Sequence, residues 1–493
     1  MQNVLLQDLM NESGVKFGTS GARGLADNIT DKIAYLYTKG FLQYLEKEGI
    51  KKSDVAIAGD LRPSTPRIMF AVAKACKDFG FNPIGGEFVP SPAVAMYGIQ
   101  KNIPAIMVTG SHIPEDRNGI KYNLPVGEIL KKDEAGIKAQ VVEYDESLFS
   151  DRELKDCLSN KNERFFGDSS EIKDAYINRY LSVFPSDALS GKKIVYYEHS
   201  AVGRDILPFI YEKLGASVIR VSRSEKLIAV DTEAVRKEDL ESAKIWAKEY
   251  NPDIILSTDG DSDRPLIFDE NGTWVPGDIL GVLVSKYLNA NAVCAPVSVN
   301  SVLETLNDFN VIKRTKIGSP YVIEAMQNIH KNNKDFNIVG YEANGGFLLE
   351  SDIKIGNKIL PMLPTRDAAI VHLSILLLSI KTNLPVSQIV ENLHARVAIS
   401  NRVQNFETSK SKKFIEDLSK NIENVREEFD FLDSKIVKTD ETDGLRIYFE
   451  DDYIVHLRPS GNAPEFRCYV EAKDEVYAKN LLNKMIKRME ELR

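Results

Sequence analysis

The sequence predicts an α/β protein of four domains: three α/β domains with mixed sheets and a smaller C-terminal α+β domain, arranged around a central cleft. A short apolar run, a turn rich in Gly, Asp or Ser, and a stretch of helical period recur along most of the chain. This pattern is typical of strands that alternate with helices. The length of 493 residues suits three or four domains.

The first block carries two predicted strands, at 55–58 and 105–108. The segment 68–81 between them has helical period, and both strands end in loops with the chemistry of turns. A polar stretch at 159–171 marks the end of the block. We therefore place the first domain at 1–164.

The same pattern occurs in two further blocks, which we place at 165–270 and 271–385. Each again pairs apolar runs with loops that carry acidic or glycine-rich motifs. Such loops follow the carboxyl ends of strands, where α/β proteins bind their ligands. The predicted elements are a helix at 277–290 and strands at 194–197, 254–256, 293–299 and 337–339.

The last block, at 386–493, has a different pattern. A charged amphipathic helix is expected over 409–429 and a closing helix over 475–492. Two strands are expected between them, at 443–450 and 452–460. This order predicts a smaller α+β domain.

The composition excludes several classes of protein. With 63 Lys+Arg against 72 Asp+Glu the net charge is −9, so we expect no nucleic-acid partner. The 4 cysteines lie far apart, which disfavours zinc sites and disulfides and suits reduced thiols. The N-terminus lacks the features of a signal peptide, and the longest apolar run, 368–380, is too short to cross a bilayer. We expect a soluble cytoplasmic protein with no membrane partner.

The first candidate loop, at 18–24, combines three glycines with Thr19, Ser20 and Arg23. Glycines let backbone N–H groups approach an anion closely, and an arginine is suited to phosphate. A flexible turn with a solvated arginine explains the loop about as well.

The second candidate loop follows the predicted strand 105–108 and contains Ser111 and His112, with Lys121 further on. A serine beside an imidazole and cations can act as a nucleophile or carry a phosphate. The alternative is a Ser/His turn that caps the next helix.

The third candidate loop places Asp259, Asp261 and Asp263 at alternate positions, followed by Arg264. Three carboxylates so close would repel each other unless they converge on a cation, and Mg²⁺ is preferred where phosphate supplies further oxygens. A calcium hand is the main competitor. It is disfavoured because Arg264 occupies the sixth position of that motif, where the turn needs glycine, and because a strand precedes the loop.

Two further loops complete the set. Glu342 and Asn344 lie on a glycine-rich turn and can bind vicinal sugar hydroxyls, although the sequence alone favours a plain hairpin turn with Asn-Gly at its tip. The loop at the end of the strand 452–460 offers a guanidinium, a hydroxyl, an amide and free backbone N–H groups around one anion. The residues of this phosphate cradle are Arg458, Ser460, Gly461 and Asn462, with Arg467 beyond them.

The five loops, in this order and spacing, resemble the α-D-phosphohexomutase superfamily over essentially the whole chain. The resemblance implies three related α/β domains and a fourth of α+β type. It implies that Ser111 is a phosphoserine that shares one Mg²⁺ with Asp259, Asp261 and Asp263. It also implies that the fourth loop contacts the sugar and the fifth holds the substrate phosphate, with Thr19, Ser20 and Arg264 as further substrate contacts.

The resemblance also implies a reaction. The serine phosphate passes to a sugar phosphate, the resulting bisphosphate turns over in the cleft, and its other phosphate returns to the serine; a sugar bisphosphate therefore activates the enzyme. His112, Lys121 and Lys316 are the candidates for proton transfer, while Arg23 is expected to orient and stabilise.

The loops look most like those of bacterial phosphomannomutases, whose product would serve GDP-mannose supply. A glucose-specific or dual-specificity phosphohexomutase stays open, because mannose and glucose differ only at C2; a phosphoglucosamine mutase is less favoured. A non-catalytic sugar-phosphate binder and a phosphatase are further alternatives, and monomer and homodimer are both open.

Some positions depart from the family pattern. Ser262 stands where the metal loop often has glycine, Ile113 where asparagine is common, and Asn462 where threonine is frequent. Many relatives read Gly-Glu-x-Ser-Gly-His in the sugar loop, whereas this chain reads Tyr-Glu-Ala-Asn-Gly-Gly. A histidine's role therefore has no counterpart at Gly346.

Overall fold

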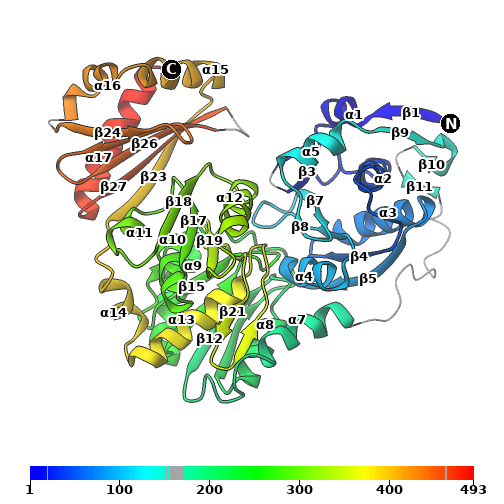
Figure 1. Cartoon of the computed structure of the whole chain (residues 1–493), viewed down its shortest axis with the longest axis horizontal. Helices are drawn as coiled ribbons and strands as arrows, with labels where there is room; N and C mark the ends of the chain where they lie inside the picture. Colours follow the sequence, from blue (N-terminus) through cyan, green and yellow to red (C-terminus); the bar gives the residue numbers. More distant parts are fainter. Residues whose placement is uncertain (19, 152, 156–169, 433, 461–463) are drawn as a thin grey trace.

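Four larger β-sheets organise the part of the chain that the computed structural model describes (Figure 1). The described residues are 1–493 except 19, 152, 156–169, 433 and 461–463. The predicted domain limit at 164/165 lies outside the described residues, and the limits at 270/271 and 385/386 stay predictions. Mixed sheets with a smaller α+β unit at the C-terminus confirm the predicted fold class.

The first sheet consists, in spatial order, of β2 (Lys16–Phe17), β3 (Gly21–Leu25), β7 (Arg117–Leu124), β6 (Ala105–Val108), β4 (Asp54–Gly59) and β5 (Asn82–Phe88), with β8 (Gly127–Glu128) beside β7. β4 is parallel to β5 and β6, and β7 is antiparallel to β6. The apolar runs predicted at 55–58 and 105–108 are buried in β4 and β6, as expected for central parallel strands.

Helices and short strand pairs surround this sheet. The predicted helix at 68–81 is confirmed as the main part of α3, whose Pro66 lies in the first turn. The other elements are α1 (Leu6–Ser13), α2 (Asp31–Lys47), α3 (Thr65–Asp78), α4 (Ser91–Lys101), α5 (Lys131–Lys138), the pair β1 (Gln2–Leu5) and β9 (Val141–Tyr144), and the pair β10 (Phe149–Ser150) and β11 (Glu153–Leu154).

The second and third sheets share one topology. The second has the order β13 (Ser217–Arg223), β12 (Lys193–His199), β14 (Ile254–Thr258), β15 (Pro265–Phe268), β16 (Trp274–Val275). The third has the order β18 (Val311–Thr315), β17 (Ala292–Pro296), β19 (Ile338–Tyr341), β20 (Phe347–Leu349). Their helices are α7 (Glu171–Leu181), α8 (Ile206–Lys213), α9 (Lys237–Tyr250), α10 (Gly277–Tyr287), α11 (Val302–Thr305), α12 (Ser319–Asn332), α13 (Ala368–Thr382) and α14 (Val386–Glu391), and the hairpin β21 (Ile353–Ile355) and β22 (Lys358–Leu360) precedes α13.

The first three sheets repeat the same arrangement of a parallel trio followed by an antiparallel strand. The repeats are β5-β4-β6-β7, β13-β12-β14-β15 and β18-β17-β19-β20. In each repeat, the loop between the third strand and the antiparallel strand carries one of the predicted motifs: the serine, the aspartates and the sugar loop. The site is thus built from equivalent positions of three related units.

The C-terminal sheet is antiparallel, with the order β23 (Val397–Gln404), β27 (Glu465–Ala472), β26 (Ile454–Pro459), β25 (Leu445–Phe449), β24 (Ile436–Asp440). It carries α15 (Thr408–Ser419), α16 (Ile422–Glu428) and α17 (Glu475–Glu491). The single helix predicted at 409–429 is wrong: Asn421 has an extended backbone and its side chain accepts a hydrogen bond from the N–H of Glu423, so it ends one helix and caps the next.

The first three sheets share one large hydrophobic cluster, each of them also has a smaller cluster of its own, and the C-terminal sheet has a separate one. One cluster is continuous from β4 through β12 to β17, containing Ala56, Tyr196 and Val293. The C-terminal sheet has its own cluster, around Phe466 and Met485. In Figure 1 this sheet, with α15 and α17, lies at the end of the molecule opposite the N-terminus. Within the described residues, no helix has both the length and the apolar character needed to span a membrane.

Candidate active site

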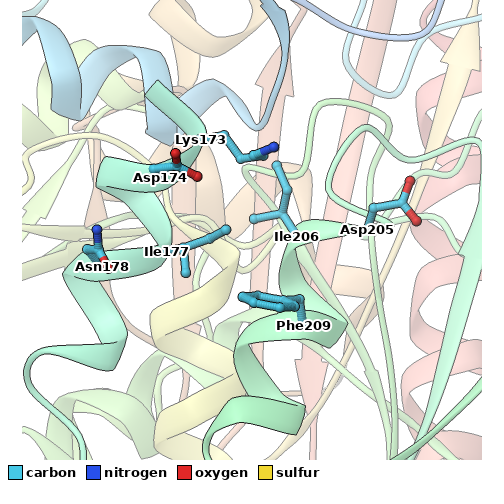
Figure 2. A pocket seen from close by; sticks show the side chains of 7 residues that line it. All are labelled: Lys173, Asp174, Ile177, Asn178, Asp205, Ile206 and Phe209. Atoms are coloured by element: carbon cyan, nitrogen blue, oxygen red, sulfur yellow. The ribbon is translucent and has the colours of Figure 1, made fainter. Parts of the chain in front are cut away.

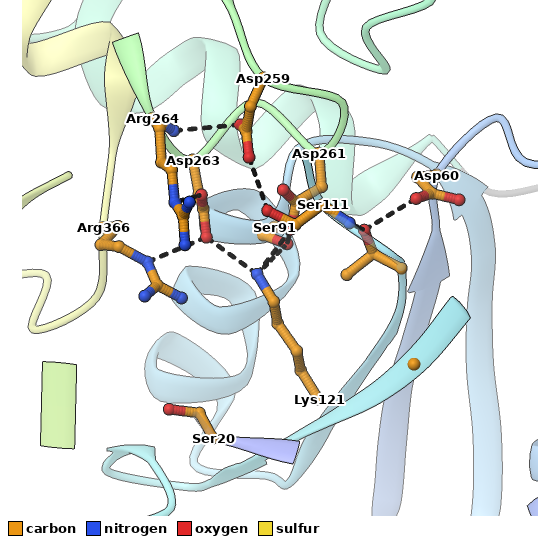
Figure 3. Close-up of polar contacts among 12 residues, drawn as sticks. Ser20, Asp60, Ser91, Ser111, Lys121, Asp259, Asp261, Asp263, Arg264 and Arg366 are labelled. Atoms are coloured by element: carbon orange, nitrogen blue, oxygen red, sulfur yellow. Dashed lines mark hydrogen bonds and ion pairs between the residues drawn. The ribbon is translucent and has the colours of Figure 1, made fainter. Parts of the chain in front are cut away.

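Ser111 lies at the centre of the site, on the loop between β6 and β7. It is buried and has a left-handed backbone, with φ of 55°. Its backbone N–H donates to Thr109 Oγ1 at 2.8 Å, and its Oγ donates to Oδ2 of Asp259 at 2.6 Å (Figure 3). The chain continues directly into β7, so the alternative of a turn that caps a following helix is wrong.

A buried ion pair between Arg62 and Asp60 stabilises the serine loop, and no sequence motif had indicated it. Arg62, 1% exposed, directs Nε to Asp60 at 3.1 Å. Asp60 in turn accepts hydrogen bonds from Thr109 Oγ1 and the N–H of Gly110. The remaining N–H groups of Arg62 donate to the carbonyl oxygens of Ser111, Ile113, Pro114 and Arg117. Charged residues directly after the strand 55–58 were the only sequence signal for this role.

The aspartate loop forms a buried carboxylate cluster opposite Ser111. One ligand atom from each of Asp259, Asp261 and Asp263 lies within 4.8 Å of the others. Burial and the two neighbouring carboxylates raise the pKa of Asp259 well above its ordinary value. Within the described residues, Oδ1 of Asp261 and Oδ1 of Asp263 have no hydrogen-bond partner. Three buried carboxylates that converge in this way, two of them with an oxygen that accepts no hydrogen bond, fit a hard divalent cation.

Local backbone geometry brings the aspartate loop against the serine loop. A Cβ at Gly260 would lie 2.6 Å from the carbonyl oxygen of Ser111, so only glycine permits this approach. Ser262 adopts φ of 57°, a left-handed conformation that favours glycine. The loop follows strand β14 rather than a helix, which counts against a calcium hand.

Two cationic side chains, Lys121 and Arg366, bind Oδ2 atoms of the aspartates. Lys121 Nζ lies 2.6 Å from Asp261 Oδ2 and 2.8 Å from Asp263 Oδ2 (Figure 3). Burial opposes the charge of Lys121, but the two carboxylates outweigh it and raise its pKa. Arg366 Nε lies 3.0 Å from the same oxygen of Asp263. The charge on these Oδ2 atoms is thus neutralised, while the Oδ1 atoms of Asp261 and Asp263 accept no hydrogen bond within the described residues.

His112 is held in its neutral form. Arg264 Nη1 donates to His112 Nδ1 at 2.8 Å, and Ser111 Oγ lies 3.4 Å from the same nitrogen. The charge of Arg264, together with burial and Arg23, lowers the pKa of His112 to about 2. Burial, Arg264 and Arg366 lower the pKa of Arg23 to about 10, so Arg23 stays charged at neutral pH.

The sugar loop is both a hairpin turn and a carrier of polar groups. β19 and β20 pair antiparallel around it, and Gly345 has φ of 84° at the turn. Asn344 Oδ1 accepts from the N–H of Gly346 at 2.9 Å, which fixes the turn. Glu342 Oε2 lies 3.2 Å from Arg366 Nη1. The hairpin turn expected from the sequence is thus present, and sugar binding by Glu342 and Asn344 stays a prediction.

The C-terminal sheet contributes two neighbouring arginines. Arg458 on β26 and Arg467 on β27 are direct register partners. Each has a carboxylate neighbour: Arg458 Nε lies 2.9 Å from Asp443 Oδ2 and Arg467 Nη2 lies 3.1 Å from Glu465 Oε2. Two like charges placed opposite each other are unfavourable unless an anion lies near them. Ser460 is buried next to them, whereas Gly461 and Asn462 lie outside the described residues.

The remaining predicted residues have different positions. Thr19 lies outside the described residues. Ser20 is buried and donates to Glu128 Oε2 at 2.5 Å. Lys316 is exposed and lines a groove together with Tyr321 and Thr442. Glu128, which no sequence pattern had indicated, also accepts from Ser319 and Thr365 of the third unit.

A pocket of about 480 Å³ lies elsewhere, between α7 and α8 (Figure 2). Figure 2 shows Ile177, Ile206 and Phe209 at its apolar wall, with Lys173, Asp174, Asn178 and Asp205 around them. The described residues that line it include none of the predicted site residues, so the serine and aspartate loops remain the candidate active site.

Comparison with known families covers most of the chain. Four models of one family match in order: phosphoglucomutase/phosphomannomutase, alpha/beta/alpha domain I over 14–148, domain II over 174–272, domain III over 276–397, and the C-terminal domain over 404–488.

Individual relatives agree with the family match. A phosphomannomutase of Salmonella muenchen is 42% identical over 480 residues, which cover 97% of this chain and 96% of the relative. A phosphomannomutase of Sinorhizobium fredii (strain NBRC 101917 / NGR234) is 41% identical over 471 residues, covering 95% and 97%. The crystal structure of a phosphoglucomutase/phosphomannomutase family protein from Burkholderia thailandensis superposes with a TM-score of 0.73 at 16% identity, covering 96% of each chain; it is similar in fold.

Proposed function

The chain belongs to the phosphoglucomutase/phosphomannomutase family, and we propose on this premise that it is a phosphomannomutase, an isomerase that interconverts mannose 6-phosphate and mannose 1-phosphate. The observation that carries the proposal is the 2.6 Å contact between Ser111 Oγ and Asp259, beside two further buried aspartates. The likeness to phosphomannomutases over nearly the full length supports mannose as the sugar.

Asp259, Asp261, Asp263 and Ser111 would together hold one Mg²⁺ per chain. Their buried oxygens fit such an ion, as described above. When bound, the ion offsets the negative charge that a phosphoserine would add beside three carboxylates.

The reaction requires Ser111 to carry a phosphoryl group on Oγ. A hydroxyl oxygen of the bound hexose phosphate forms a bond to phosphorus while the bond from phosphorus to Oγ breaks, and the hydroxyl proton passes to a base. The product is a hexose bisphosphate, which returns its other phosphoryl group to Oγ after turning over in the cleft. A trace of sugar bisphosphate would therefore prime the unmodified enzyme.

We assign to Lys121 the donation of a proton to Ser111 Oγ as its bond to phosphorus breaks. Its ammonium group lies in the carboxylate cluster next to the serine loop, and the two carboxylates raise its pKa, so it donates a proton and does not act as the base. His112 is less suitable as a base, because its Nδ1 already accepts a hydrogen bond from Arg264. Lys316 is exposed on the third unit and would need the cleft to close to take part. Arg23 and Arg264 stay charged and would stabilise the phosphoryl oxygens.

The sugar and its distal phosphate would lie on the remaining two loops. Glu342 and Asn344 would contact the ring hydroxyls, as acceptors fixed on a rigid turn. Arg458, Ser460, Gly461, Asn462 and Arg467 would bind the phosphate that is not transferred, at either end of the sugar. The product mannose 1-phosphate would then supply GDP-mannose synthesis in the cytoplasm.

The decisive experiment compares kcat/KM for mannose 1-phosphate and glucose 1-phosphate, with Mg²⁺ and a trace of hexose bisphosphate. A clear mannose preference supports a phosphomannomutase, and equal rates indicate a dual-specificity phosphohexomutase. Activity on glucosamine phosphate alone would indicate a phosphoglucosamine mutase.

The variant Ser111→Ala separates an enzyme from a sugar-phosphate binder. A mutase loses most of its turnover and cannot take up a covalent phosphate, which intact-mass spectrometry detects. A binder keeps its affinity and shows no phosphorylation in either form, and that result would contradict the proposal.

A further inference from the structure

Arg366 connects the aspartate loop, which carries Asp263, with the sugar loop, which carries Glu342. It lies between β22 and α13 and is 2% exposed. Its Nε donates to Asp263 Oδ2 at 3.0 Å, and its Nη1 donates to Glu342 Oε2 at 3.2 Å. Ser319 Oγ accepts from the same Nη1 at 3.4 Å. One planar guanidinium therefore holds the aspartate loop and the sugar loop at a fixed separation.

The contact leaves Oδ1 of Asp263 without a hydrogen bond. Arg366 and Lys121 both bind Oδ2, while Oδ1 accepts no hydrogen bond within the described residues and has Arg264 Nε at 3.7 Å. Arg366 thus orients this carboxylate without competing for the atom that would bind a cation. It acts on the reacting groups through Asp263 and Glu342, which makes it a positioning residue.

Gly346 provides the space that Arg366 fills. A Cβ at this position would lie 2.5 Å from Cδ and 2.6 Å from Cγ of Arg366. The backbone of Gly346 is not in the left-handed region, so a side chain is excluded here by volume and not by conformation. In this chain the volume next to the sugar loop is filled by an arginine from a different segment.

A third carboxylate completes the environment of Arg366. Glu128 is buried and accepts from Ser20 at 2.5 Å and from Thr365 at 2.6 Å. Burial favours its neutral form, but Arg366 and these hydrogen bonds outweigh burial and lower the pKa of Glu128. Arg366 therefore lies among three carboxylates, and its removal would leave buried negative charge uncompensated.

We propose that Arg366, in the space left by Gly346, is the positioning residue that fixes Glu342 relative to the aspartate loop and so sets the affinity and selectivity for the hexose ring. The inference rests on the proposed function, since it concerns how that site holds its sugar. It assigns Gly346 and Arg366 to one functional pair.

The test uses the full chain with Arg366→Lys, Arg366→Ala, Gly346→Ala and the double variant Gly346→Ala/Arg366→Ala. Arg204→Lys is the matched control, because Arg204 is also buried but binds His199, Ser224 and Glu225 away from this cluster. The readouts are kcat and KM for mannose 1-phosphate and glucose 1-phosphate, the melting temperature, and calorimetric binding of mannose 6-phosphate in a Ser111→Ala background.

We expect Arg366→Ala to raise KM and the dissociation constant roughly tenfold or more, with a changed mannose-to-glucose ratio. Arg366→Lys keeps the charge but not the planar fork, so it should recover part of the affinity. Gly346→Ala should weaken binding in the wild-type background and add little in the Arg366→Ala background, because its methyl group then meets no arginine. Arg204→Lys should leave KM unchanged.

Unchanged KM and sugar affinity in Arg366→Lys and Gly346→Ala would overturn the inference, even if the melting temperature falls, because the pair would then be only structural. Additive effects of Gly346→Ala and Arg366→Ala would overturn it too. Failure of the proposed function is seen separately, in a wild-type protein that turns over no mannose phosphate. Should Arg366→Ala not fold, Arg366→Lys and Gly346→Ala decide the question.

Discussion

Ser111 Oγ donates a 2.6 Å hydrogen bond to Asp259 Oδ2, and the two residues belong to equivalent loops of the first and second sheets. The serine is thus held by a carboxylate from a separate structural unit. Gly260 allows the approach, since any Cβ there would meet the backbone of Ser111. The position of the Ser111 hydroxyl against the acidic cluster therefore depends on how two units pack together, and not on one loop alone.

Removal of a divalent cation should abolish turnover, because the site gathers three buried carboxylates. We expect EDTA to inactivate the protein and Mg²⁺ to restore it. Asp263→Asn should weaken Mg²⁺ binding about tenfold or more, measured by activity and melting temperature against Mg²⁺ concentration. Asp269→Asn is the control, since Asp269 is also buried but caps the turn after β15. Full activity in EDTA would refute this prediction.

Arg62 should be essential for the serine loop. All its N–H groups are used, by Asp60 and by four carbonyl oxygens of the loop that follows Ser111. Arg62→Ala would leave Asp60 buried without its partner, at a cost of about 3–5 kcal/mol in the free energy of unfolding. Denaturant titration measures this loss, and activity should fall with it.

Arg67→Ala is the comparison for Arg62→Ala. Arg67 binds Asp31 and two carbonyl oxygens, but its side chain is 35% exposed. Water can replace part of its contacts, and the buried Asp31 keeps the hydrogen bond from the N–H of Leu154, so we expect a smaller loss than for Arg62→Ala. Equal losses in the two variants would show that burial of Arg62 has no special role.

The strands, the loops and the cluster of aspartates could be predicted because each depends on residues that are close together in the sequence. Apolar runs indicate the buried strands, and alternate aspartates indicate a cation. Arg366 could not be assigned from the sequence, since Asp263 lies 103 positions away from it. The contact from Thr365 to Glu128 spans 237 positions. Such pairs are decided by the packing of separate units.

The sequence also could not show how a hairpin turn arranges the polar side chains of the loop 340–346. Asn344 fixes the turn by accepting from Gly346, while Glu342 on the same loop is turned to Arg366. The break at Asn421 was missed for a different reason: the helical period continues across it, and only the backbone conformation reveals the cap.

Glu350 should make the stability of the protein depend on pH. It is 5% exposed, its Oε1 lies 3.6 Å from His330 Nδ1, and burial raises its pKa from 4.5 to about 7. Because folding raises this pKa, Glu350 is protonated below pH 4.5 and its contribution to stability is then fully present. As the pH rises towards 7 the carboxyl ionises and this contribution is lost. Full ionisation costs roughly 3 kcal/mol.

Glu350→Gln should therefore raise the melting temperature by a few degrees at pH 8, and the gain should shrink as the pH falls below about 5. Glu324→Gln, on the exposed face of α12, should change the melting temperature little at any pH. A melting profile of Glu350→Gln that runs parallel to the wild type across this range would contradict the assignment.

The C-terminal sheet should close over the cleft when a sugar phosphate binds. Its core is separate from the core shared by the other sheets, so it can move as a unit. Arg458 and Arg467 lie side by side on this sheet, and each has one carboxylate neighbour, Asp443 or Glu465. A phosphate held by both arginines and a sugar held by Glu342 would draw the sheet toward the third unit and exclude water from Ser111.

Small-angle scattering of Ser111→Ala, which retains its ligand unchanged, should show a smaller radius of gyration with mannose 6-phosphate than with mannose. Identical curves for the two ligands would mean that the phosphate binds without closure, and that water is excluded by the loops of the first three units alone.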